Sequence, residues 1–250
     1  MMKTKNYLLI LTAIAAMAFL SVACTAQTEE TYRGNAPVVH TESDWERNGG
    51  YQGAEIREEH SSDGEGLLHP TDAELSDAEI TDLLYMREEE KVARDVYAAL
   101  YDRWGLQVFQ SIAQSEQNHM DSILELLNAY GLDDPAAQTK AGEFSNTDLQ
   151  QLYDTLVAQG QASLEEALRV GALIEEVDIL DLQDAIQNTD KADIAHVYTN
   201  LMFGSENHLR SFTAQLERQI GLTYEPLYLD QESYQQIITD QPGGRGRAGN

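Results

Sequence analysis

Apolar residues recur at steps of three and four positions through most of this chain, and that periodicity constrains its fold more than any other feature. Residues spaced in this way lie on one face of an α-helix, so each periodic stretch predicts a helix with a buried side. The pattern begins near residue 75 and continues, in separate stretches, to about residue 221. The only strand-like sequence is LTYEPLYL, residues 222–229, which we expect to lie extended over the helices. The sequence therefore predicts an all-α protein.

Capping residues and glycines set the limits of the predicted helices. Ser76 with Glu79, and Ser163 with Glu166, have the spacing of a capping box, in which both side chains bind free amides at a helix start. Glycines follow the first, second and last long helices. Four long helices are predicted at about 76–104, 106–130, 163–187 and 190–221, with a shorter one at about 147–159. We expect a four-helix bundle over residues 75–236, with the short extra helix between its second and third helices.

The start of the chain has the features of an export signal. Lys3 and Lys5 precede an apolar run over residues 7–23, which ends in small residues and is too short to favour a permanent membrane helix. The only cysteine, Cys24, follows this run directly, as the lipid-modified cysteine of bacterial lipoproteins does. We therefore predict a signal peptide of the lipoprotein type over residues 1–24, with lipidation at Cys24. The alternative is cleavage after Ala26, which would release a soluble protein.

Both alternatives place the mature protein outside the cytoplasm. In the first it is lipid-anchored to the bacterial cell envelope, with the lipid as its only link to a membrane, and in the second it is periplasmic or secreted. Residues 25–74 are polar and rich in Gly, Ser, Asp and Glu, which predicts a disordered acidic linker. Residues 237–250 are predicted to form a flexible tail.

The charge of the chain excludes one class of partner. Asp and Glu number 43 against 16 Lys and Arg, which gives a formal net charge of −27. Such a chain repels phosphate backbones, so we expect no nucleic acid partner. An acidic excess by itself more often reflects a solvated surface than cation binding. A metal site therefore has to be argued from particular residues.

Carboxylates and imidazoles interrupt the apolar faces of the four long helices. Glu90 falls within the stripe of the first helix, and Glu116 and His119 fall one turn apart within the stripe of the second. Glu175 lies near the centre of the apolar face of the third, and His208 shares the face of the fourth. A buried carboxylate without a partner is costly, so inward carboxylates on adjacent helices predict a bound cation.

Two further acidic residues adjoin Glu175 in the sequence. Glu176 lies toward the edge of the apolar face, whereas Asp178 lies on the opposite flank of the same face. We therefore prefer Glu175 to Glu176 as a ligand and keep Asp178 as a further candidate.

The motif of the second helix returns incompletely in the fourth. SEQNHM at residues 115–120 resembles GSENHL at 204–209, but Ser205 stands three residues before His208, where the second helix has a glutamate. Glu206 lies about 160° from His208 around a regular helix and is expected to face outward. The alternatives to a metal are a surface position for the first-helix glutamate, a hydrogen-bonded core position for a histidine, and a surface pair in the second helix. The coincidence across four helices favours the metal.

These features resemble the ferritin-like di-iron superfamily, in which two helices each supply a Glu and two each supply Glu-x-x-His. The segments LLYMREEEKVARDVYAALYDRWG, FQSIAQSEQNHMDSILELLNAYG, VGALIEEVDILDL and GSENHLRSF also resemble a ferritin-like family of bacteria and archaea known as a domain of unknown function, DUF2202. The resemblance covers roughly residues 75–234. It implies a site made of Glu90, Glu116, His119, Glu175, His208 and the further acid Asp178, with Tyr97 as a nearby donor.

The resemblance implies an exported ferritin-like metal-binding protein, of the di-iron carboxylate type, with oxidase-like, peroxidase-like or iron-handling activity. Two iron ions are expected, or one if Ser205 leaves the second position incomplete, and manganese or zinc would suit the same ligands. The implied partners are dioxygen or peroxide and an external electron donor, because one cysteine cannot build a cysteine-ligated iron centre. The alternative is a mononuclear or metal-free bundle that acts as a binding or interaction module of the cell envelope.

Overall fold

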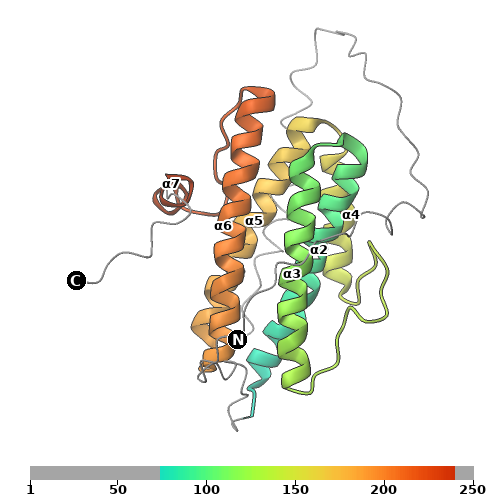
Figure 1. Ribbon diagram of the computed structural model, residues 1–250, viewed down its shortest axis with the longest axis vertical. Coiled ribbons are helices and arrows are strands. Elements are labelled where there is room, and N and C mark those ends of the chain that lie inside the picture. The colour runs from blue at the N-terminus through green and yellow to red at the C-terminus, as the bar shows by residue number, and fades with distance from the viewer. Residues whose placement is uncertain (1–73, 240–250) are drawn as a thin grey trace, which may run out of the picture.

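The computed structural model describes residues 74–239, and every described element of regular structure is a helix. The long helices α2 (Asp77–Trp104), α3 (Gln107–Ala129), α5 (Leu164–Asn188) and α6 (Ala192–Ile220) lie side by side (Figure 1). The shorter α4 (Thr147–Gly160) lies between α3 and α5 in the chain, where the short extra helix was expected, and α7 (Gln231–Thr239) follows α6. The prediction of an all-α helical bundle is confirmed.

Some of the predicted features lie outside the described residues. These are the signal peptide, the lipidation site Cys24, the acidic linker up to residue 73 and the tail beyond residue 239. Within residues 74–239, none of the helices is both long enough and apolar enough to span a bilayer.

The directions of the helices determine which residues share a level in the bundle. Short connections join α2 to α3 and α5 to α6, so each of these pairs is antiparallel. The connection from α3 to α5 returns along the bundle through α4, so α5 runs in the same direction as α3 (Figure 1). The chain therefore runs in one direction along the bundle in α3 and α5, and in the opposite direction in α2 and α6.

The helix starts follow the predicted capping chemistry only in part. At α2, the Ser76 backbone N–H donates to Glu79 Oε2 over 2.8 Å, and the Glu79 N–H donates to Ser76 Oγ over 3.2 Å, which completes the capping box. At α5, Ser163 Oγ accepts from the Glu166 N–H over 3.1 Å. The Glu166 carboxylate, however, accepts from Gln159 Nε2 of α4 over 2.8 Å. The second predicted capping box is therefore only half formed, because a tertiary partner takes its carboxylate.

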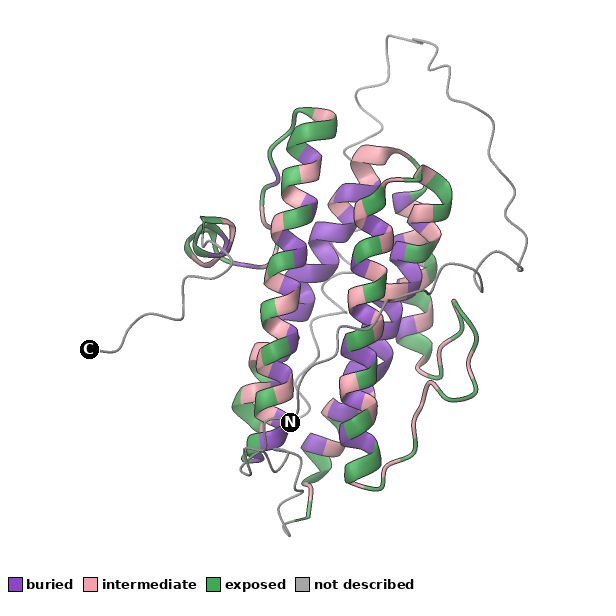
Figure 2. Cartoon of the chain, viewed as in Figure 1, coloured by how far each residue is buried: buried purple, intermediate pink, exposed green. Residues whose placement is uncertain are grey.

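The middle of α2 is buried on nearly all sides, including its charged residues. Figure 2 shows the buried stretches of the helices on the sides that face one another. Arg87 donates to the Met120 carbonyl of α3 over 2.7 Å and forms an ion pair with Asp134 at 2.9 Å. Lys91 Nζ lies 2.7 Å from Asp95 Oδ2 and also donates to two carbonyls of residues 140–143. These charges face the loop over residues 131–146 rather than solvent, so they hold that loop against the bundle.

A C-terminal strap, residues 222–239, covers part of α5 and α6. Tyr224 and Leu229 are buried, so the segment covers the bundle as expected. It is not extended throughout, because residues 227–229 bend and direct three successive backbone N–H groups at Glu176. The sequence did not predict α7, which runs past residue 236, where the flexible tail was expected to begin. This helix is short, and it buries Tyr234 and Ile237. We attribute its formation to docking rather than to local propensity.

Candidate metal centre

The structure brings the five principal candidate ligands together inside the bundle, on four different helices. They form two groups, each with ligand atoms within 4.8 Å of one another, and Glu116 belongs to both. Glu90 and His119 complete the first group, and Glu175 and His208 complete the second. All five residues are buried, with exposed fractions between 1% and 9%. These groups could hold a metal ion.

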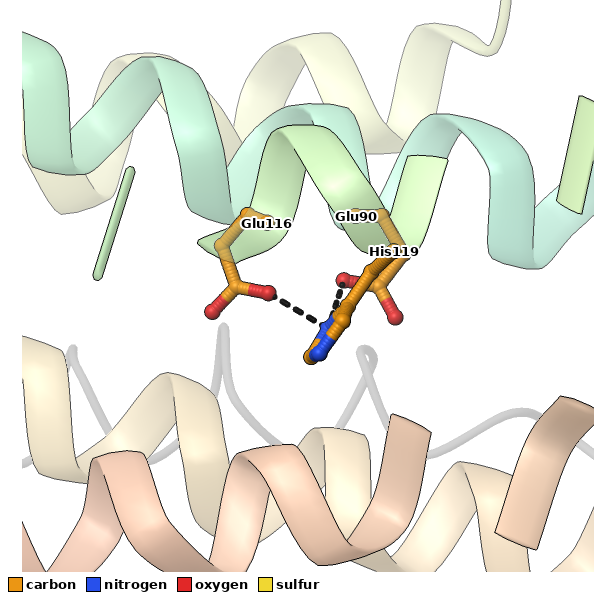
Figure 3. Close-up of side chains that lie close together, drawn as sticks. All are labelled: Glu90, Glu116 and His119. Carbon is orange, nitrogen blue, oxygen red and sulfur yellow. Dashed lines mark hydrogen bonds and ion pairs between the residues drawn. The ribbon is translucent and has the colours of Figure 1, made fainter. Parts of the chain in front are cut away.

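The first group joins α2 to α3. His119 Nδ1 lies 2.7 Å from Glu116 Oε2 and 3.3 Å from Glu90 Oε2. Figure 3 shows the three side chains converging on the same space between the helices, with the imidazole between the two carboxylates. Glu90 Oε1 is buried and has no hydrogen-bond partner among the described residues. A carboxylate oxygen that is free inside the protein is suited to bind a cation.

The second group joins α3 to α5 and α6. His208 Nδ1 lies 2.8 Å from Glu116 Oε1 and 3.4 Å from Glu175 Oε2. Although these distances are short, the nitrogen lacks hydrogen-bond alignment with any described partner. Ligand atoms that surround one ion at about 2.1 Å lie about 3.0 Å apart in octahedral geometry and about 3.4 Å apart in tetrahedral geometry, without pointing at each other. The spacing therefore fits ligands of a shared cation.

Other side chains orient the second group and its surroundings. Tyr97 Oη donates to Glu175 Oε1 over 2.5 Å, which leaves the other oxygen of Glu175 toward His208. Ser205 Oγ donates to Asp178 Oδ2 over 2.5 Å, whereas Asp178 Oδ1 is buried without a partner among the described residues. Asp178 belongs to neither group of ligand atoms. Ser205 thus binds an α5 carboxylate from the position where the resemblance places a glutamate.

Burial and mutual repulsion make the carboxylic acids of the site hard to ionise. Burial, opposed in part by His119, raises the pKa of Glu90 to about 7. Burial together with the charge of Glu116 raises the pKa of Glu175 to about 7, against the opposing effect of His208. For Asp178, burial and the charges of Glu90 and Glu175 raise the pKa well above its usual range.

The imidazoles and Glu116 shift in the opposite sense, toward their charged forms. Burial alone would lower the pKa of His119, but the carboxylates of Glu90 and Glu116 outweigh it and raise that pKa to about 12. In the same way Glu116 and Glu175 raise the pKa of His208 to about 10, despite burial. Burial would raise the pKa of Glu116, yet the two histidines lower it below its usual range. Without a metal, protons therefore supply the positive charge that the carboxylates need.

Sequence reasoning missed the function of Glu176, the neighbour of Glu175. Its side chain is fully buried on the other side of α5, where it accepts from Tyr224 Oη over 2.5 Å. It also accepts from the backbone N–H groups of Leu227 at 3.1 Å, of Tyr228 at 2.9 Å and of Leu229 at 2.9 Å. Glu176 therefore anchors the C-terminal strap. Its partners lie some fifty residues away in the sequence, so no local sequence pattern predicts these contacts. Glu206, predicted to face outward, is partly exposed and belongs to neither ligand group.

Comparisons with known proteins agree on one family. The family model described as "Uncharacterized protein domain (DUF2202)" matches residues 79–241, which include every candidate ligand. The protein MJ0754 of Methanocaldococcus jannaschii is 48% identical over 165 residues, covering 66% of this chain and 89% of MJ0754. The crystal structure of the hypothetical protein MJ0754 matches with a TM-score of 0.67 and 46% identity, over 69% of this chain and 98% of that one. The chain therefore belongs to the DUF2202 family.

Proposed function

We propose that this protein is an exported ferritin-like metalloprotein that binds two iron ions within its helical bundle and reacts with dioxygen or peroxide. The observation that carries the proposal is the pair of buried ligand groups that share Glu116. Mixed carboxylate and imidazole ligands suit iron, manganese and zinc, and the resemblance to di-iron bundles favours iron. Export, with or without lipidation of Cys24, is proposed from the sequence of the first 24 residues.

The five ligand residues would form two metal-binding positions. Glu90 and His119 would hold one ion, Glu175 and His208 the other, and Glu116 would contribute one oxygen to each. Two bound ferrous ions would supply two electrons to an oxidant. The bundle excludes bulk water from the site, and Tyr97 fixes the orientation of Glu175 through its hydrogen bond. Asp178 would add a further carboxylate close to these positions.

A second candidate function is a mononuclear or metal-free bundle that acts as an interaction module at the cell envelope. Ser205 favours this alternative, because it offers no carboxylate where the resemblance implies one. The two functions differ in metal content, since the alternative requires one ion or none per chain.

We expect the metal-free protein to accelerate the oxidation of ferrous iron in air. Stopped-flow absorbance after mixing the protein with ferrous ions would follow the reaction against buffer alone. His119→Ala and His208→Ala should each slow it at least about tenfold, because each removes a ligand from one position. Oxidation no faster than in buffer would contradict the proposed reaction while leaving metal binding open to direct measurement.

Metal binding is expected to release about three protons per chain at pH 7. With pKa values of about 12 and about 10, His119 and His208 are protonated in the metal-free protein, whereas Glu90 and Glu175, at about 7, are each half protonated. Cations displace these protons because they bind the deprotonated groups. Calorimetric titration with Co²⁺ in two buffers of different ionisation enthalpy would count the released protons. A heat of binding that does not depend on the buffer would contradict the expected release.

The raised pKa values of Glu90 and Glu175 determine whether the metal-free protein becomes more or less stable as the pH rises. The folded-state pKa values of Glu90 and Glu175 lie above the ordinary value of 4.5, so the folded protein binds more protons than the unfolded chain between about pH 4.5 and 7. The stabilisation is complete below pH 4.5 and is lost as the pH rises through 7. The metal-free protein should therefore unfold at a lower temperature at pH 8 than at pH 5. Bound metal should reduce this difference, because a cation replaces the protons.

A further inference from the structure

Each of the two histidines contacts the other histidine's helix, at the residue four positions before that other histidine. Ser115 stands four residues before His119, and Gly204 stands four residues before His208. Ser115 Oγ lies 2.9 Å from Nε2 of His208. On the other side, a Cβ added to Gly204 would lie 2.5 Å from Nε2 of His119 and 2.6 Å from its Cε1. The Nε2 edge of each imidazole thus faces the residue that stands four positions before the other histidine.

The two contacts differ in what they allow. Ser115 carries a side chain and still leaves His208 room for a hydrogen bond. Gly204 has no side chain, and the His119 ring occupies the space that one would fill. Among the described residues, no hydrogen bond to Nε2 of His119 is formed, and both of its ion-pair contacts are made by Nδ1.

Backbone conformation does not explain the glycine. Gly204 lies inside α6, far from either end, and it is absent from the described glycines with positive φ. A glycine within a helix weakens that helix, because it loses more conformational freedom on folding than other residues. The close approach of His119 is therefore the structural reason for a glycine here.

We propose that Gly204 is a positioning residue, whose missing side chain lets His119 reach Glu90 and Glu116 and so completes one of the two metal positions. The inference rests on the proposed metal centre. With alanine at position 204, the ring would have to retreat from 2.5 Å to at least 3.0 Å, and to 3.4 Å for an ordinary contact. Metal ligation tolerates displacements of only about 0.2 Å. The first position would therefore be lost, whereas His208 and Glu175, on the far side of Glu116, would keep theirs.

Gly160 provides a matched control. A Cβ there would lie 2.6 Å from Leu100 Cδ2, which is nearly the same intrusion, but its neighbour is an apolar side chain rather than a candidate ligand. Gly160→Ala should therefore disturb packing without altering metal binding.

The first test needs no metal. Urea unfolding of the metal-free protein would compare Gly204→Ala in the presence and absence of His119. Gly204→Ala should destabilise the protein when His119 is present, and the His119→Ala background should remove most of that effect, because the clash is gone. If Gly204→Ala alone fails to fold, the double variant Gly204→Ala/His119→Ala should restore folding. Equal destabilisation in both backgrounds would overturn the proposal.

The second test counts bound ions by calorimetric titration with Co²⁺. The wild-type protein and Gly160→Ala should bind two ions, and Gly204→Ala should bind one, with at least a 100-fold loss of affinity for the other. When His119→Ala is added to Gly204→Ala, the remaining ion should still bind. When His208→Ala is added instead, that ion should be lost. Two ions bound by Gly204→Ala with wild-type affinity would overturn the proposal. A wild-type protein that binds no ion would instead refute the metal centre, and the unfolding test would still decide whether Gly204 positions His119.

Discussion

Glu116→Gln is expected to abolish both metal positions with a single substitution. One oxygen of Glu116 lies 2.7 Å from His119 Nδ1 and the other 2.8 Å from His208 Nδ1, so both groups depend on it. Glutamine keeps the size of the side chain but has no charge, and one of its two ends is a hydrogen-bond donor. We expect Co²⁺ affinity to fall by at least about 100-fold at both positions, which is more than the loss typical of residues that only orient a ligand.

The pattern across single variants separates a shared ligand from a general electrostatic effect. Glu90→Gln and Glu175→Gln should each remove one position and leave the other. Glu125→Gln changes an exposed carboxylate on the same helix as Glu116 and should leave both intact. If Glu116→Gln still bound one ion as tightly as the wild type, the shared position of Glu116 would be disproved.

Glu176→Ala is expected to destabilise the fold by about 3–5 kcal/mol without changing metal stoichiometry. The buried carboxylate accepts hydrogen bonds from Tyr224 and from backbone groups of the C-terminal strap. Its removal leaves the buried hydroxyl of Tyr224 and the buried N–H of Leu229 without this acceptor, and the loss of a buried hydrogen-bond partner is among the costliest kinds of substitution. Chemical denaturation would measure the loss of stability, and Co²⁺ titration below the unfolding transition would count the ions that are still bound.

A matched control lies on the same helix. Glu165 forms a partly exposed ion pair with Arg169 at 2.9 Å, so Glu165→Ala should cost less than about 1 kcal/mol. If Glu176→Ala were as mild as Glu165→Ala, the strap would not depend on its carboxylate anchor. If it emptied the metal site of a protein that remained folded, the separation between the two faces of α5 would be wrong.

The sequence predicted the parts of the structure that depend on helical periodicity. The steps of three and four residues between apolar positions predicted the four long helices. They also predicted that Glu90 and Glu175 face the interior, where both are buried. The same reasoning placed Glu176 toward the edge of the apolar face but could not show that it is buried as well. Its burial depends on a strap that approaches from a distant part of the chain, and periodicity carries no information about such partners.

Tertiary partners also explain the other differences. Lys91 and Asp95 are charged residues of α2 that the loop over residues 131–146 covers, and helical periodicity does not indicate that cover. Glu166 has the spacing of a capping box, yet Gln159 takes its carboxylate. The hydrogen bond between Ser205 and Asp178 joins two helices, and neither local sequence indicates it. In each case a contact with another element decided the outcome, and the local sequence pattern carries no information about such a contact.

Metal content tests the central claim most directly, namely that buried carboxylates and imidazoles converge because cations hold them. Residues 27–250 would be expressed in iron-supplemented medium, purified without chelators and assayed by elemental analysis, with Glu116→Gln prepared in parallel. We expect about two iron ions per chain in the wild type, as in di-iron carboxylate bundles, and none in the variant. A folded wild-type protein that carries no metal, and takes up none when ferrous ions are added without air, would contradict the claim.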